Sequence, residues 1–164
     1  MTQQILNHSQ IVHKVKRIAY QVYETNANET EVIIAGINGR GFEFAKLIKS
    51  QLELISPLKI TLCEVYINKT NVQEEISTSI DTSEYENKSL VLVDDVLNSG
   101  TTLIYCVKHF LNVNLKQFKT AVLVNRNHKK YPVKADFKGI SLSTSINEHI
   151  KVELEPNNFK AYLA

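Results

Sequence analysis

The stretch VLVDDVLNSGTT (residues 91–102) decides the fold, because an apolar run ends in two adjacent acids and then in a loop of small polar residues. The apolar run is typical of a strand buried within a sheet. Asp94 and Asp95 stand where this strand emerges, and side chains alternate along a strand, so the two cannot both face the core. Like charges this close are costly unless hydroxyls, backbone donors or a cation compensate them. A sugar diol would supply the hydroxyls, and a bound magnesium ion would supply the cation.

The loop after the acid pair has the composition of a phosphate-binding turn. It comprises Asn98, Ser99, Gly100, Thr101 and Thr102. Small side chains let backbone N–H groups approach an anion, hydroxyls add donors, and the following helix N-terminus adds a favourable dipole. The simpler alternative is a strand-to-helix connection with an N-cap. Two other phosphate motifs are absent: G-x-x-x-x-G-K-[ST] does not occur, and the glycines of GINGRG (36–41) lack the dinucleotide spacing G-x-G-x-x-G.

Apolar strands alternate with amphipathic helices along the chain. Strands are expected at 31–36, 58–67, 89–93 and 118–124, with weaker signals at 139–144 and 151–155. Helices are expected at 10–23, 42–55 and 103–112, and the polar segment 68–88 is expected to be a mobile loop or flap. This order predicts an α/β fold with a parallel sheet and helices on both faces. Ligands bind beyond the carboxyl ends of such strands.

The bulk properties are those of an ordinary globular domain. The length of 164 residues favours one domain spanning 1–164. No apolar run approaches the roughly 20 residues of a membrane span, and the N-terminal residues show no signal-peptide pattern, so we expect a cytoplasmic protein without a membrane partner. Cys63 and Cys106 are expected to be buried free thiols. The five histidines show no metal-ligand spacing.

The opening stretch resembles the phosphoribosyl-pyrophosphate (PRPP) signature of type I phosphoribosyltransferases. IAGINGRGFEFAKLI (34–48) resembles the pyrophosphate-loop segment of the family that contains the pyrimidine-operon attenuator (PyrR) and uracil phosphoribosyltransferase. ILNHSQIVHKVKRIAYQVYE (5–24) resembles the family's first helix, and AVLVNRNHKKYPVKADFKG (121–139) resembles the segment after its last core strand. Agreement is poorest at 67–88. The resemblance implies a central parallel sheet flanked by helices, with a flexible flap and a small hood.

The resemblance implies transfer of ribose 5-phosphate from PRPP to a nucleobase, a pyrimidine such as uracil, with release of pyrophosphate. Mg²⁺ would be the cofactor, held through the substrate near Asp94 and Asp95 with no direct protein ligand. Asp94 and Asp95 would hold the ribose hydroxyls, and residues 98–102, the phosphate loop, would grip the 5′-phosphate. The catalytic residues would be Asp94, Asp95 and Arg40.

The resemblance also implies roles for two further segments and for the flap. The pyrophosphate turn would comprise Asn38, Gly39 and Arg40. The nucleobase would be met by Val124, Asn125 and Arg126. Lys69 would be the cation of the flap, where the family usually carries arginine, and a lysine lacks the bidentate fork.

Together with Lys69 on the flap, two further departures leave room for a relative that binds PRPP or a nucleotide but turns over slowly. Asn98 stands where the family often has tyrosine or aspartate, and asparagine cannot act as a general base. Asn125-Arg126-Asn127 replaces the family's aspartate-arginine-glycine, which weakens the case for uracil.

A regulator that binds RNA is a further alternative. From residue 108 to residue 138 the chain carries eight lysines and arginines against the single acid Asp136. In the attenuator family a basic face binds messenger RNA, and its counterpart here would comprise Lys14, Lys16, Arg17, His128, Lys129, Lys130 and Lys134. Clustered lysines favour phosphate contacts without specifying sequence, whereas Ile140 replaces a basic family position and counts against RNA. A solvated basic surface is the plainer interpretation. The family also implies a homo-oligomer, a dimer or tetramer.

Overall fold

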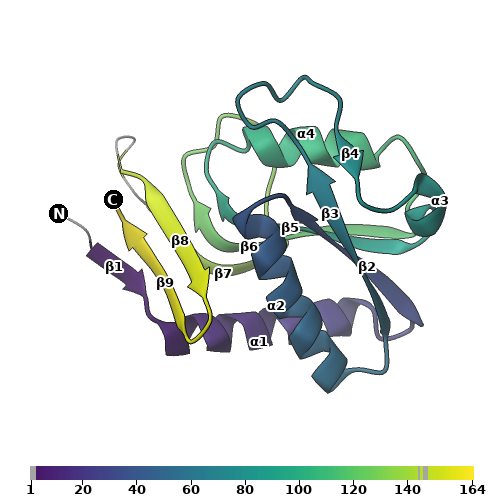
Figure 1. The fold of residues 1–164 in the computed structure, drawn as a ribbon, viewed down its shortest axis with the longest axis horizontal. Coiled ribbons are helices and arrows are strands. Elements are labelled where there is room, and N and C mark those ends of the chain that lie inside the picture. The colour runs from purple at the N-terminus through teal and green to yellow at the C-terminus, as the bar shows by residue number, and fades with distance from the viewer. Residues whose placement is uncertain (1–2, 144, 146–147) are drawn as a thin grey trace.

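The structure is a computed structural model, and it describes residues 3–143, 145 and 148–164. Its strands form two sheets (Figure 1), of order β4-β3-β2-β5-β6-β7 and β1-β9-β8. The larger sheet comprises β2 (Glu31–Ile37), β3 (Lys59–Tyr66), β4 (Ser77–Thr78), β5 (Ser89–Leu97), β6 (Gln117–Arg126) and β7 (Phe137–Leu142). The smaller sheet comprises β1 (Gln3–Leu6), β8 (Ile150–Glu155) and β9 (Asn158–Leu163).

The larger sheet is parallel except for its edge strand β4, which runs antiparallel to β3. This confirms the predicted α/β class. β2 and β5 are neighbours at the centre of the sheet. From there the chain runs outward in opposite directions, from β2 to β3 on one side and from β5 to β6 on the other. The carboxyl ends of β2 and β5 therefore flank the point where the strand order reverses, which is where open α/β sheets bind ligands.

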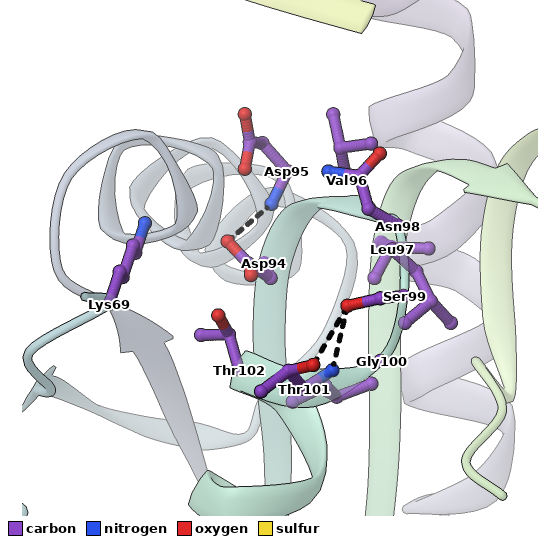
Figure 2. Close-up of a pocket in the computed structure, with 12 residues that line it drawn as sticks. Lys69, Asp94, Asp95, Val96, Leu97, Asn98, Ser99, Gly100, Thr101 and Thr102 are labelled. Carbon is purple, nitrogen blue, oxygen red and sulfur yellow. Dashed lines mark hydrogen bonds between the residues drawn. The ribbon is translucent and has the colours of Figure 1, made fainter. Parts of the chain in front are cut away.

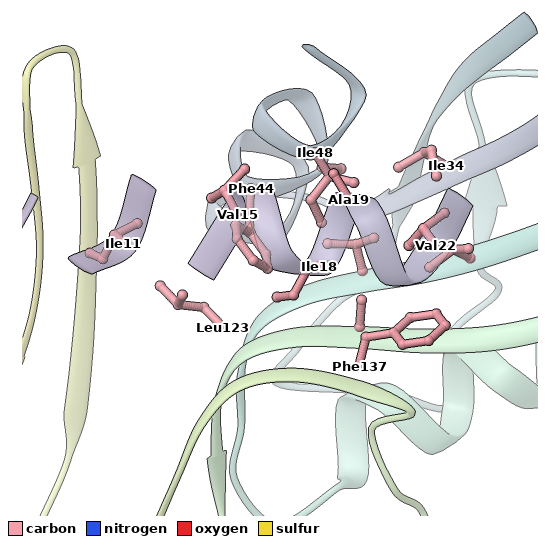
Figure 3. Close-up of a cluster of buried hydrophobic side chains, with 14 of the residues drawn as sticks. Ile11, Val15, Ile18, Ala19, Val22, Ile34, Phe44, Ile48, Leu123 and Phe137 are labelled. Atoms are coloured by element: carbon pink, nitrogen blue, oxygen red, sulfur yellow. The ribbon is translucent and has the colours of Figure 1, made fainter. Parts of the chain in front are cut away.

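Helices cover both faces of the larger sheet. α1 (His8–Thr25) and α2 (Arg40–Ile55) share one core with the sheet, and α4 (Thr101–Phe110) shares the other. Figure 3 shows Ile11, Ile18 and Val22 of α1 in the first core. They lie on the predicted apolar stripe, and each is fully buried, which contributes roughly 1.5–3 kcal/mol per side chain. Asn7 begins the helix, because its side chain accepts from the backbone N–H of residue 10 in a capping box.

The sheet β1-β9-β8, called the hood below, brings the two ends of the chain together (Figure 1). β8 turns into β9 at Asn157, whose φ of 60° lies in the left-handed region. Leu6, Val152 and Ala161 bury the inner face of the hood in the same core as α1. The expected small hood is confirmed. Of its three strands, the sequence predicts only β8, as the segment 151–155. β1 and β9 are additional strands.

Several strands differ in length from their predicted ranges. β5 continues to Leu97, so the acid pair lies within the strand rather than beyond it, and β6 continues to Arg126. The segment expected at 139–144 is β7, which begins at Phe137 and ends at Leu142. Residue 144 lies outside the described residues.

The segment 68–88, expected to be a mobile loop or flap, contains two regular elements in its second half. β4 pairs with β3, and the short helix α3 (Thr82–Tyr85) buries the ring of Tyr85. Ile76 and Ile80 pack against the same core as α4. These elements have 2 and 4 residues, and segments so short show no sustained period in the sequence.

Both cysteines are buried and free, as expected. Burial raises the pKa of the Cys63 thiol to about 11 and that of the Cys106 thiol to about 12. Across the described ranges, no helix is long and apolar enough to cross a membrane.

Candidate functional site

The predicted site residues converge at the carboxyl edge of the larger sheet. A cavity of about 130 Å³ is lined by Lys69, Val122 and the continuous segment 94–103. Figure 2 shows the acid pair on one side of this cavity and the phosphate loop on the other. Segments far apart in the sequence meet here because β5 delivers the acid pair and the loop between β3 and β4 delivers Lys69.

Asp94 is the buried member of the acid pair. Its side chain is 6% exposed, and its Oδ1 accepts a hydrogen bond from the backbone N–H of Asp95 at 2.9 Å. Burial raises the pKa of the Asp94 carboxyl well above its ordinary value, the charge of Asp95 adds to the shift, and the charge of Lys69 opposes it. Asp95 is only half-buried and also lines the cavity. The alternation of strand side chains thus gives the two acids different environments.

Gly41 makes room for Asp94, a role that the sequence analysis does not assign. It lies in the first turn of α2, and a Cβ at this position would come within 2.7 Å of Oδ1 of Asp94. No local sequence signal marks this contact, because it depends on how closely α2 approaches β5.

The phosphate loop is built around Gly100, whose φ of 88° favours glycine. The hydroxyls of Ser99 and Thr101 lie 2.9 Å apart, and Ser99 Oγ also accepts from the backbone N–H of Thr101 at 3.3 Å. α4 begins at Thr101, so its free N–H groups and positive dipole end lie at the cavity. Thr102 completes the lining.

A segment that contains Lys130 of the predicted basic face also supports this loop. The backbone N–H groups of Lys130 and Tyr131 both donate to the carbonyl oxygen of Ser99, at 2.7 and 3.1 Å. A Cβ on Gly100 would meet Cγ1 of Val133 at 2.6 Å. Residues 130–133 therefore brace the loop from outside the cavity, which sequence spacing alone does not reveal.

The pyrophosphate turn connects β2 to α2. Gly39 has a φ of 89°, a conformation that glycine adopts without strain. The side chain of Asn38 does not face solvent freely, since its Oδ1 accepts from the backbone N–H of Ile67 at 3.3 Å. Arg40 is exposed, and within the described residues it has no ion-pair or hydrogen-bond partner. Hydrogen bonds from Tyr162 and Lys160 lower the pKa of Glu153 in the hood, and the charge of Arg40 contributes to this shift. The guanidinium of Arg40 is exposed to solvent.

Lys69 lies at the cavity and belongs to the loop between β3 and β4. Its Nζ lies 4.0 Å from the position that a Cβ would take on Gly39. Its side chain also lines the cavity beside Asp94 (Figure 2). One lysine therefore bridges the pyrophosphate turn and the acid pair.

The three residues predicted to meet the nucleobase differ in accessibility. Val124 is fully buried in the core. Asn125 donates through Nδ2 to Oγ of Ser141 at 3.2 Å, and its buried Oδ1 lacks a hydrogen-bond partner among the described residues. Arg126 donates through Nη1 to Oδ1 of Asn98 at 3.2 Å, which places it at the phosphate loop. Their contact with a base stays a prediction.

The predicted basic face is divided between the two sides of the sheet. Arg17 on α1 donates through Nη2 to the carbonyl oxygens of Lys138 and Gly139, at 3.0 and 2.7 Å, and so ties α1 to β7. The segment containing residues 128–130 instead packs on the side of α4, where Tyr131 contacts Tyr105 edge to face. Lys134 lies 3.7 Å from a carboxylate oxygen of Asp136.

The acid pair fits a metal only in part. Within the described parts of the chain, no group of three or more His, Cys, Asp or Glu side chains could hold a metal ion. Two carboxylates beside a cavity can share a divalent cation with a ligand that brings further oxygen atoms. The residues present therefore suit a cation that arrives with its substrate.

The model of the phosphoribosyl transferase domain matches residues 1–157. Bifunctional protein PyrR of Streptococcus mutans is 30% identical over 156 residues, which cover 93% of this chain and 89% of that protein. Bifunctional protein PyrR of Streptococcus thermophilus is 32% identical over 141 residues, with 84% and 82% covered.

Solved structures show the same fold. A hypoxanthine-guanine phosphoribosyltransferase from Bacillus anthracis superimposes with a TM-score of 0.78 at 19% identity, covering 99% of this chain and 96% of that one. The hypoxanthine phosphoribosyltransferase of Trypanosoma cruzi gives a TM-score of 0.78 at 12% identity, with 97% and 95% covered. The match of the domain model over nearly the whole chain, together with these relatives, shows that the chain belongs to the phosphoribosyltransferase family and is a homologue of the bifunctional protein PyrR.

Proposed function

We propose that this protein transfers ribose 5-phosphate from PRPP to a nucleobase, with Mg²⁺ as cofactor and pyrophosphate as the second product. The observation that carries the proposal is the shared edge of the sheet, where the acid pair and the phosphate loop line one cavity and Lys69 links that cavity to the pyrophosphate turn. Together these groups match the three polar parts of PRPP: its ribose hydroxyls, its 5′-phosphate and its pyrophosphate.

The reaction would break the bond between the anomeric carbon and pyrophosphate and form a bond from that carbon to a base nitrogen. The carboxylates of Asp94 and Asp95 would accept hydrogen bonds from the ribose hydroxyls and stabilise the positive charge that develops on the sugar. The electron pair of the broken bond leaves with pyrophosphate, beside Arg40 and Lys69. The nitrogen loses its proton to solvent or to the leaving group, since Asn98 cannot accept it.

Bound Mg²⁺ would neutralise charge on the pyrophosphate and so make it a better leaving group. The chain's own contribution is to orient the two ends of PRPP. The phosphate loop would fix one end and the pyrophosphate turn the other, which holds the anomeric carbon in place for attack.

A pyrimidine is the proposed base, on the strength of the PyrR relatives. The buried Oδ1 of Asn125 and the guanidinium of Arg126 lie at the carboxyl end of β6, close to the phosphate loop. Both residues are buried, so a base that presents an N–H group and a carbonyl group would reach this acceptor and this donor once the residues that cover them move. A purine presents such a pair as well, so the base must be identified by experiment.

Pyrophosphate release from PRPP and Mg²⁺ tests the proposal, with uracil, other pyrimidines and purines offered singly. Release that depends on one base would establish the activity and its substrate class. Asp95→Asn is expected to reduce turnover at least a hundredfold while the fold persists. PRPP binding without turnover across the whole panel would instead leave a PRPP sensor and would overturn the transferase proposal.

RNA binding is a second candidate function, for which the lysines of the basic segment would supply phosphate contacts. Two backbone hydrogen bonds join this segment to the carbonyl of Ser99. RNA held by Lys129 and Lys130 would act on the loop that grips the sugar phosphate, so RNA and nucleotide affinities would be coupled. A gel shift at low and high salt tests this, with Lys129→Gln/Lys130→Gln as the variant. Light scattering would test the dimer or tetramer that we also propose.

A further inference from the structure

The loop between β3 and β4 holds Lys69 in a defined place although the loop itself is exposed. The side chains of residues 68–71 and 73–75 are all exposed. Nevertheless, Nζ of Lys69 lies beside Gly39 and lines the cavity with the acid pair. Lysine is among the side chains with the most rotamer freedom to lose, so a fixed backbone at residue 69 helps to keep its charge near the site.

Asn68 provides that fixed backbone. Its Oδ1 accepts from the backbone N–H of Thr70 at 3.0 Å, from the hydroxyl of Thr70 at 2.7 Å and from the backbone N–H of Asn71 at 3.3 Å. This is an Asx turn, in which a side-chain oxygen replaces a backbone acceptor. Lys69 lies inside this turn, so the peptide bonds on both sides of Lys69 are part of the turn.

Glu74 closes the loop on the other side. Its Oε2 accepts from Nδ2 of Asn68 at 2.9 Å, and its Oε1 accepts from Nδ2 of Asn71 at 3.4 Å. The backbone adds two further bonds, from the N–H of Asn71 to the carbonyl of Asn68 and from the N–H of Glu74 to the carbonyl of Asn71, both at 3.1 Å. The polar groups of residues 68–74 are thus linked to one another, while Val72 packs against the core that α4 shares.

The base of the loop is anchored to the pyrophosphate turn. Asn38 accepts from the N–H of Ile67 through Oδ1 and donates its own N–H to the carbonyl of Val65 at 2.8 Å. Ile67 is 5% exposed. The loop therefore begins at a fixed point next to Gly39, and the Asx turn sets the direction that Lys69 takes from it.

This network lies in solvent and buries little apolar surface, so it adds little to global stability. Its consequence is local, because it fixes the shape of the loop that carries Lys69. We propose that Asn68, closed by Glu74, is a positioning residue that aims Lys69 at the departing pyrophosphate. The inference rests on the proposed function. In it, Lys69 contacts the pyrophosphate, and Asn68 acts only by positioning Lys69.

Calorimetric binding of pyrophosphate in excess Mg²⁺, with kcat and KM for PRPP, tests the proposal. Asn68→Ala is expected to weaken pyrophosphate binding about threefold to tenfold, the effect of loosening one charged contact. The midpoint of thermal unfolding should stay within about 2 °C of wild type, because the network is exposed. kcat/KM for PRPP should fall with the affinity for pyrophosphate.

Exchanging the acid and the amide between residues 68 and 74, called the reversed pair below, gives the sharpest control. Asn68→Asp keeps the acceptor of the Asx turn but places a carboxylate against Glu74, so binding should weaken. Asn68→Asp/Glu74→Gln should restore it, since the glutamine amide can donate to Asp Oδ2 and its oxygen can still accept from Asn71. Ser79→Ala, which removes an exposed bond to the backbone N–H of Glu64 elsewhere in the flap, should bind pyrophosphate as wild type does.

The dependence on Lys69 completes the test. In a Lys69→Gln background, Asn68→Ala should cause no further loss of pyrophosphate affinity. Equal losses with and without Lys69, wild-type binding by Asn68→Ala, or failure of the reversed pair to recover would each overturn the positioning role. Absence of pyrophosphate binding by the wild-type protein would overturn the proposed function, and this inference with it.

Discussion

Gly41 stands directly against Asp94. A Cβ at residue 41 would lie 2.7 Å from Oδ1 of Asp94, 3.1 Å from its Cα and 3.1 Å from the carbonyl oxygen of Val93. Two of these three atoms belong to the backbone of β5, so rotation of the aspartate side chain cannot relieve the contact. α2 can approach β5 this closely only because residue 41 has no side chain. That approach sets the pyrophosphate turn beside the acid pair.

Gly41→Ala is therefore expected to displace Asp94 and to lower kcat/KM for PRPP about tenfold to a hundredfold. Alanine is itself the better helix former by about 1 kcal/mol, which offsets part of the strain and limits the change in unfolding temperature. Pyrophosphate release at varied PRPP concentration measures the effect. Ser50→Ala on the exposed side of the same helix is the matched control, and equal kinetics in both variants would contradict the role of Gly41.

Asp94→Asn should make the protein more stable and inactive. Because burial raises the folded-state pKa of Asp94, the folded state keeps a proton that the unfolded state releases above about pH 4. Stability therefore falls as pH rises from that value through the raised pKa, and the loss is complete above it. Asparagine carries no charge and retains the oxygen that accepts from Asp95.

Thermal unfolding at two pH values measures this effect. At pH 8 we expect Asp94→Asn to unfold about 2–6 °C above wild type, and near pH 4 the two should coincide. Asp95→Asn is the matched comparison, and it should gain less because Asp95 is only half-buried. A lower unfolding temperature for Asp94→Asn at pH 8 would show that the charge is compensated in the folded protein.

The larger sheet could be predicted because its strands are covered on both faces. β2, β5 and β6 are almost wholly buried, so each is a continuous apolar run in the sequence. The hood could not be predicted in the same way. β1 pairs Gln3 with Leu163 at the other end of the chain, and neither segment shows a strand pattern until the two are brought together.

The site could be predicted as far as its residues follow strands. The acid pair and both turns share one edge because parallel strands end on the same side. Two contacts between elements that are distant in the sequence could not be predicted. Gly41 matters through its distance from another element, and Tyr131 supports Ser99 through its backbone, so side-chain type carries no signal in either case.

The two thiols should be unreactive in the folded protein. Burial raises the pKa of Cys63 to about 11 and that of Cys106 to about 12, so at pH 8 almost no thiolate is present. Treatment with iodoacetamide followed by mass spectrometry should find neither cysteine modified in native protein and both modified in denaturant. Rapid labelling of either one in native protein would show that its core opens.

Arg126→Lys should raise KM for the nucleobase more than KM for PRPP. The guanidinium spans two acceptors, with Nη1 donating to Asn98 Oδ1 at 3.2 Å and Nη2 donating to the carbonyl of Ser145 at 2.8 Å. A lysine offers one point charge and cannot reproduce both contacts in the same geometry. If the side chain at residue 126 is thereby moved out of its proposed contact with the base, loss of that charged hydrogen bond corresponds to about a tenfold rise in KM for the base, and KM for PRPP should change less. Arg17→Lys is the control, because Arg17 binds the carbonyls of β7 away from the cavity. If KM for PRPP rose more than KM for the base, Arg126 would belong to the phosphate loop rather than to the base site.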